Sequence, residues 1–147
     1  MNLGPKNPNI LGSPDNNERL NKLKLRIQNL INQIFASIEE FENDSKKINY
    51  IFILVQQLSN DLSSLSVAIE SGIPNLDIYI NKVEKVVNLL EKINNNQSPE
   101  DEPSEDKEIY RILNLGHQEA LKGSEIQYDI ESLKKILANI DVYLKNI

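Results

Sequence analysis

The sequence predicts an all-α protein: an antiparallel helical bundle or coiled coil with long helices and a disordered N-terminal arm. Apolar residues recur at alternating steps of three and four along most of the chain, which places them on one stripe of a helix. The one strand-like run, residues 50–55, lies inside a longer helical pattern. A Gly-Ile-Pro turn and an acidic stretch separate the periodic segments, so the pattern indicates several helices rather than one.

Residues 1–14 are the predicted disordered arm. Three prolines, two glycines and few apolar side chains leave this stretch little surface to bury. It lacks the apolar core of a signal peptide, and the longest apolar run in the chain has six residues against the roughly 20 that a membrane span needs. We therefore expect a soluble intracellular protein, in the nucleus or the cytoplasm, without membrane insertion.

Residues 15–94 are predicted to form three helices, at about 15–42, 46–71 and 75–94, with a hinge at 72–74. Gly72 and Pro74 enforce that hinge, whereas no Gly or Pro breaks the chain near residue 44, so residues 15–71 could be one bent helix or two. Ile53 and Leu54 lie outside the apolar row of their helix, which is typical of a helix buried on several sides. The three rows are Leu20, Leu23, Ile27, Leu30 and Ile34; Ile51, Val55, Leu58, Leu62, Leu65 and Ile69; and Leu76, Ile80, Val83, Val87 and Leu90.

Residues 95–107 are predicted to be an acidic disordered linker, because they carry two prolines and five acids without an apolar residue. Ser98 stands before a proline with an acid at the third following position, and Ser104 is followed by two acids. Both resemble kinase acceptor contexts. The sequence therefore offers Ser98 and Ser104 as phosphorylation sites, and an unmodified acidic loop is the alternative.

Residues 108–147 are predicted to form a helix or a helix pair with the longest apolar row of the chain. Such a row needs another helix beside it, because apolar side chains left in water forfeit their burial energy. The row could be covered within a closed four-helix bundle or by another chain, and we expect another chain to cover it. The predicted partner interface is Ile126, Ile130, Leu133, Leu137, Ile140 and Leu144.

Composition excludes several kinds of chemistry. The 22 acidic residues outnumber the 16 basic ones, and the three arginines do not cluster, which argues against direct nucleic-acid binding. Without cysteine there is no thiolate nucleophile or thiolate metal site, and a single histidine, His117, rules out a multi-histidine site. The five glycines are isolated, so there is no phosphate loop. We expect no enzyme activity, no cofactor and no metal.

Two stretches resemble small helical subunits of the middle module of the Mediator co-activator. Residues 69–72 followed by 75–79 resemble the turn between helices of the tenth subunit, although Pro74 precedes Asn75 instead of following it. Residues 19–23 and 34–38 are similar to the opening helix of the twenty-first subunit. Residues 76–87 also resemble small subunits of complexes that build lysosome-related organelles. The Mediator resemblance implies a nuclear complex subunit in transcription regulation.

The sequence therefore predicts a non-catalytic helical subunit of a multi-protein complex, with other helical subunits as partners and a hetero-oligomer favoured over a homo-oligomer. The Mediator resemblance implies that this complex acts in transcription co-activation. One alternative is a coiled-coil subunit of an organelle-trafficking or kinetochore-type complex. The other is a self-contained helical bundle that binds a small ligand.

Overall fold

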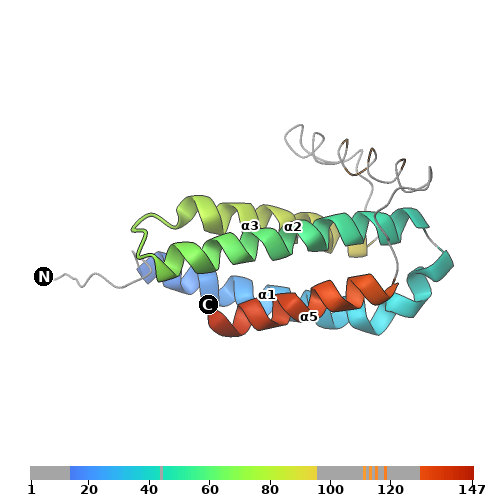
Figure 1. Ribbon diagram of the computed structural model, residues 1–147, viewed down its shortest axis with the longest axis horizontal. Helices are drawn as coiled ribbons and strands as arrows, with labels where there is room; N and C mark the ends of the chain where they lie inside the picture. The colour runs from blue at the N-terminus through green and yellow to red at the C-terminus, as the bar shows by residue number, and fades with distance from the viewer. Residues whose placement is uncertain are drawn as a thin grey trace, which may run out of the picture.

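Four long helices make up the fold in the computed structural model (Figure 1), which describes residues 14–43, 45–95 and 130–147 and the single positions 111, 113, 115 and 118. Helix α1 (Pro14–Ser37) continues into the 3-10 helix η1 (Ile38–Asn43). Helices α2 (Ser45–Glu70), α3 (Asp77–Asn94) and α5 (Ile130–Asn146) follow. The predicted all-helical bundle is confirmed for this part of the chain.

The helices run alternately up and down along one axis. Figure 1 shows α1 and α3 running in one direction and α2 and α5 in the other. Helix α2 packs against α3 and α5, and α1 contacts α3 and α5, so α1 and α2 lie on opposite corners of the bundle. The chain reverses direction after η1, which resolves the open question about residues 15–71: they form two helices.

A single apolar core fills the bundle, and the predicted rows supply most of it. The first row is at most 3% exposed, the third is fully buried, and in the second only Ile69 is partly exposed. Helix α2 packs against a neighbouring helix on two sides, so it buries residues outside its apolar row. These residues include Tyr50, Phe52 and Leu54. The rows therefore join helices of the same chain.

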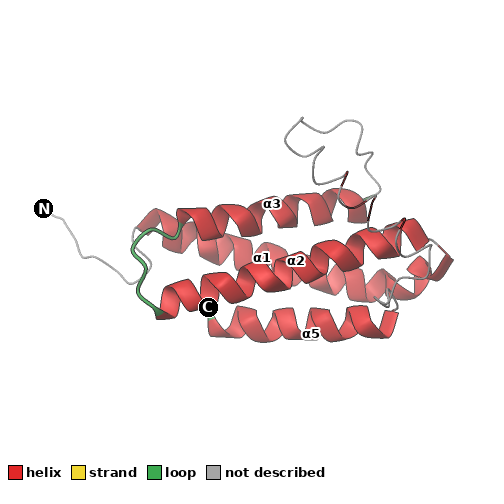
Figure 2. Cartoon of the chain, turned by 45° about the horizontal axis from the view of Figure 1, so that its top comes forward, coloured by secondary structure: helices red, strands yellow, loops and turns green. Residues whose placement is uncertain are grey.

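The turn between α2 and α3 is built on glycine, as its position predicted. Figure 2 shows this connection in green. Gly72 has a φ of +69°, in the left-handed region that glycine reaches without steric cost. The Gly72 N–H donates to Ile69 O at 3.1 Å and the Ile73 N–H to Ala68 O at 3.1 Å, which is the Schellman pattern that ends a helix.

Helices α1 and α3 are joined at the surface by a ladder of polar contacts. Arg19 lies 2.6 Å from Glu84 and 3.2 Å from Asp77. Two helical turns further along α1, Arg26 pairs with Glu91. The two arginines are seven residues apart, as are the two glutamates, and both pairs have a sequence offset of 65 residues. A constant offset is what two parallel helices in fixed register produce.

We expect the double replacement Arg19→Gln and Arg26→Gln to lower the free energy of unfolding by about 1 kcal/mol, because both pairs are partly exposed to water. The loss should shrink at high salt, which screens such pairs. Urea denaturation at low and high salt measures both effects. The control is Lys22→Gln, whose partner Glu18 lies in the same helix and is largely exposed; it should change little. A loss that is equal at both salt concentrations would contradict the electrostatic account.

Candidate functional site: the groove between α2 and α3

The predicted partner interface does not lie on the surface. Leu133, Leu137 and Ile140 are fully buried and Leu144 is 5% exposed, all in the core of the chain itself. Ile130 is partly buried against that core, and Ile126 lies outside the described residues. The physical reason is that α2 is apolar on two sides and therefore accepts α5 as well as α3. The prediction that another chain covers this row is corrected: α5 is covered from within.

The other predicted segments fall largely outside the described part of the chain. This holds for Ser98 and Ser104, for the acidic linker apart from Asn95, and for the N-terminal arm apart from Pro14, which begins α1. The predicted phosphorylation sites therefore stay predictions.

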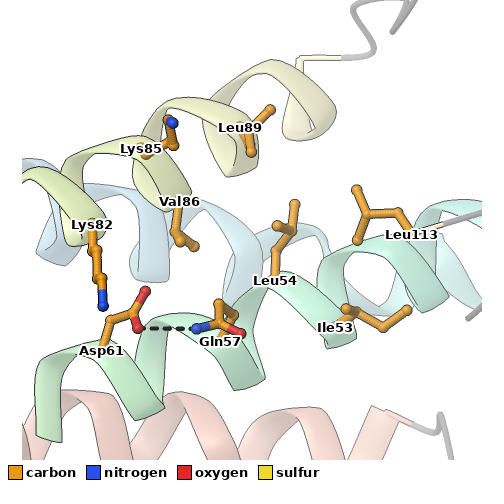
Figure 3. Close-up of a pocket in the computed structure, with 9 residues that line it drawn as sticks. All are labelled: Ile53, Leu54, Gln57, Asp61, Lys82, Lys85, Val86, Leu89 and Leu113. Atoms are coloured by element: carbon orange, nitrogen blue, oxygen red, sulfur yellow. Dashed lines mark hydrogen bonds between the residues drawn. The ribbon is translucent and has the colours of Figure 1, made fainter. Parts of the chain in front are cut away.

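A groove of about 300 Å³ lies between α2 and α3, and we take it as the candidate functional site. Two of its apolar lining residues, Leu54 and Leu89, are at most 2% exposed, and Val86 is 6% exposed. Figure 3 shows an apolar end near Leu113 and a polar end with Asp61. The lining residues are Ile53, Leu54, Gln57 and Asp61 of α2, Lys82, Lys85, Val86 and Leu89 of α3, and Leu113.

Apolar residues outside the main rows create this groove. Ile53 and Leu54 stand beside the row of α2, and Val86 and Leu89 stand beside the row of α3. Since the rows themselves fill the centre of the bundle, these extra side chains widen the apolar face toward the seam between the two helices. The sequence already showed that Ile53 and Leu54 are apolar residues outside the row of their helix. The structure shows that both line the groove toward α3.

Leu113 closes the apolar end of the groove and is only 1% exposed. The described positions around it, Arg111, Leu115 and Gln118, are exposed, with Leu115 at 50%. All four positions are helical. A helical leucine is therefore seated between α2 and α3, 19 residues beyond the end of α3 at Asn94. Sequence reasoning missed this role, because Leu113 belongs to no long apolar row.

The polar end of the groove is organised around Asp61. The side-chain amide of Gln57 donates a hydrogen bond to Asp61 Oδ1 at 2.9 Å, and Lys82 lies across the groove (Figure 3). Burial raises the pKa of Asp61, while the hydrogen bond from Gln57 and the charge of Lys82 act in the opposite direction. Lys82 and Lys85 are exposed. The rim therefore carries two lysines against one half-buried carboxylate.

We expect Asp61→Asn to stabilise the protein at neutral pH, because burial disfavours the ionised carboxylate in the folded state. As pH rises from the ordinary pKa of 3.8 toward the raised pKa of the folded state, the unfolded chain releases its proton first, so wild-type stability falls. The extra stability of Asp61→Asn over the wild type should be absent below this pH range and complete above it. The midpoints of urea denaturation of both proteins at acid and neutral pH measure the difference.

The matched control is Asp141→Asn, which removes a carboxylate paired with Lys145 on the surface of α5 and should give no gain at neutral pH. If Asp61→Asn destabilised the protein at neutral pH by more than this control, the contacts of Asp61 with Gln57 and Lys82 would outweigh its burial.

The remaining large apolar side chains at the surface stand apart from the groove and come from four different helices. Along their own helices most have polar neighbours, and single exposed apolar residues of this kind are ordinary. They are Leu25, Phe35, Val67, Ile78 and Val142.

Among the residues that the structure describes, no helix has the length and apolarity needed to cross a membrane. In the same residues, acidic and histidine side chains do not gather into a set of three that could hold a metal ion.

Comparison with models of protein families, with curated proteins and with solved structures finds no match to this chain. The resemblances to Mediator subunits and to organelle-biogenesis subunits therefore stay predictions.

Proposed function

We propose that this protein is a non-catalytic helical subunit of a multi-protein complex and that it binds a helix of another subunit in the groove between α2 and α3. One observation carries the proposal: the groove already holds a helical leucine, Leu113, at 1% exposure. A surface that buries one helical side chain so completely has the width and the apolarity that helix-in-groove recognition uses.

The groove suits a protein partner because it combines apolar depth with a charged rim. Leu54, Val86 and Leu89 offer contacts for apolar anchors, and Lys82 and Lys85 can orient the incoming helix by charge. We propose that the protein works inside the cell as part of a hetero-oligomer. The sequence resemblances and helical rows suggest seeking the partner in complexes of transcription co-activation, organelle trafficking or kinetochore assembly.

The experiment compares two double variants that make the same pair of changes, one at the partly buried Ile53 of the groove and one outside the groove. The groove variant combines Ile53→Gln with Lys85→Glu, and the control combines Leu25→Gln with Lys22→Glu on the outer face of α1, where Leu25 is 68% exposed. Both should keep the circular dichroism spectrum of the wild type. Each tagged variant is purified from cells, and the co-purified proteins are quantified by mass spectrometry. In two further chains that are otherwise wild type, a photo-cross-linker replaces Lys85 or Lys22.

The proposal expects a partner that is lost from the groove variant, is retained by the control and cross-links from position 85 through one of its helices. A partner that both variants retain, or that cross-links only from position 22, would overturn it.

A second candidate function is the binding of a small apolar ligand. The closure of the bundle on its own rows favours it, and so does the volume of the groove, which lies at the lower end of the range for small-molecule sites. Such a ligand would raise the melting temperature of the isolated chain, and Ile53→Gln would reduce that rise.

A further inference from the structure

One heptad register runs through α1, η1 and α2 without a change of phase. Every seventh residue from Leu20 onward is apolar through both helices, and a second row that starts at Leu23 is apolar except at Ser37 and Asp44. A single straight helix over residues 14–70 would therefore carry both rows on one face. The first row consists of Leu20, Ile27, Ile34, Phe41, Ile48, Val55, Leu62 and Ile69.

The reversal between α1 and α2 is made without the residues that usually enforce one. The sequence has no Gly or Pro between residues 15 and 71. The 3-10 helix η1 has six residues, whereas 3-10 stretches longer than about four residues are uncommon and often mark a hinge. Helix α2 begins at Ser45, two residues after η1 ends at Asn43. The sequence therefore permits a continuous helix at the place where the structure folds back.

Helix α1 is held in the bundle by α3 and α5, while α2, which follows it in the chain, stands at the opposite corner. Its polar side chains also reach α3. Arg19 pairs with Glu84, and the side-chain amide of Asn94 donates a hydrogen bond to Gln33 Oε1 at 3.3 Å. A second copy of the chain offers the same faces of α3 and α5, so α1 of one copy can make these contacts with the other.

We infer that two copies of this chain can exchange α1, with η1 straightening so that residues 14–70 form one helix in each copy. Exchange of an element is a low-cost route to a dimer, because the contacts of the closed bundle are rebuilt between the chains and only the hinge changes. The continuous register meets the geometric demand of the exchange, since a helix that joins two bundles stacked end to end must face both cores with the same side.

The closed monomer remains the ordinary form of the chain. In it η1 buries Ile38, which is 2% exposed, and straightening gives up that packing. Exchange also requires α1 to leave the core, so the two forms do not interconvert on dilution while they are folded. The dimer therefore forms when the chain refolds at high concentration, and each copy in it keeps α2 and α3 of one chain side by side.

The test uses the absence of cysteine from the full chain. One chain carries Arg19→Cys and a second carries Glu84→Cys; the two are mixed, unfolded in urea, refolded together at high concentration and treated with a short bis-maleimide. Because neither chain holds both cysteines, a link from position 19 to position 84 joins two chains. We expect a dimer of twice 16.8 kDa that contains this link, identified by peptide mass spectrometry. The control replaces the first chain by Asn21→Cys, at an exposed position on the other side of α1, and should give no link to position 84.

Two hinge variants should move the balance in opposite directions, as measured by chromatography after refolding at a fixed concentration. Ser45→Pro places proline at the first residue of α2, where a helix tolerates it, but in the interior of a continuous helix, where it does not. It should abolish the dimer, whereas Ser45→Ala should keep it. Asp44→Leu makes the second row apolar at the hinge and should raise the ratio of dimer to monomer about tenfold, since the burial of one leucine corresponds to roughly that factor. Its control is Glu40→Leu, at an exposed position outside both rows.

A dimer without the link from position 19 to position 84 would overturn the inference, and so would the absence of any dimer after refolding at high concentration. Equal dimer formation by Ser45→Pro and Ser45→Ala would overturn the straightening of the hinge. The cross-link leaves the hinge unaltered, so it decides the exchange even if Ser45→Pro fails to fold. None of these results decides the proposed function, which the cross-linking of a partner tests separately.

Discussion

Replacing Leu137 by alanine is expected to lower the free energy of unfolding by about 2–5 kcal/mol. Leu137 is fully buried in the middle of α5, where the helix packs against α2. The smaller side chain loses the transfer free energy of its missing carbons and leaves a cavity that the surrounding rows cannot fill. Urea denaturation followed by circular dichroism measures the loss, and the purified chain alone is sufficient.

The matched control is Val142→Ala in the same helix. Val142 is 54% exposed, so its truncation should change stability by no more than about 0.5 kcal/mol. If Leu137→Ala were as mild as Val142→Ala in the isolated chain, α5 would not be packed in the core, and its row would again be available to another chain.

Removing α5 altogether is expected to abolish the cooperative fold. A chain that ends at residue 129 lacks Leu133, Leu137, Ile140 and Leu144 and exposes the face of α2 that they cover. Burial of four such side chains contributes on the order of 10 kcal/mol, which is comparable to the whole stability of a domain. The shortened chain should show a broad, non-cooperative thermal transition in calorimetry and should aggregate.

Adding a peptide with the sequence of residues 130–147 should restore a cooperative transition, because the peptide supplies the missing face. A chain without residues 1–13 is the control, since the sequence predicts an arm there that contributes no core. A sharp, reversible transition of the chain that ends at residue 129 would contradict the account.

The helices and their buried faces could be predicted from the sequence because they are local properties. A row such as Leu20, Leu23 and Ile27 fixes which side of a helix is buried, whatever lies opposite. Gly72 fixes a helix end through its own backbone freedom. These features depend on residues within a few positions of each other.

The partners of each face could not be predicted, because an apolar row does not specify which helix covers it. The row of α5 could equally have been covered by another chain, and only the packing of α2 against both α3 and α5 shows otherwise. The pairs of Arg19 with Glu84 and of Arg26 with Glu91 join residues far apart in sequence. Neither arginine has a sequence pattern that indicates its partner.

The groove was predictable only in part. The surplus of apolar side chains at Ile53 and Leu54 indicated that α2 is buried on more than one side. Their meeting with Val86 and Leu89 depends on the antiparallel register of α2 and α3, which the turn at Gly72 sets in three dimensions. Leu113 reaches the same place from a separate segment, and no local pattern could connect it to the groove.

We predict that this chain, which closes its own apolar rows, is a folded monomer in the absence of a partner. Size-exclusion chromatography with multi-angle light scattering on the purified full chain tests it most directly. The account predicts a mass of 16.8 kDa that does not change with protein concentration. A mass of two or more chains that falls toward the monomer value on dilution would contradict it.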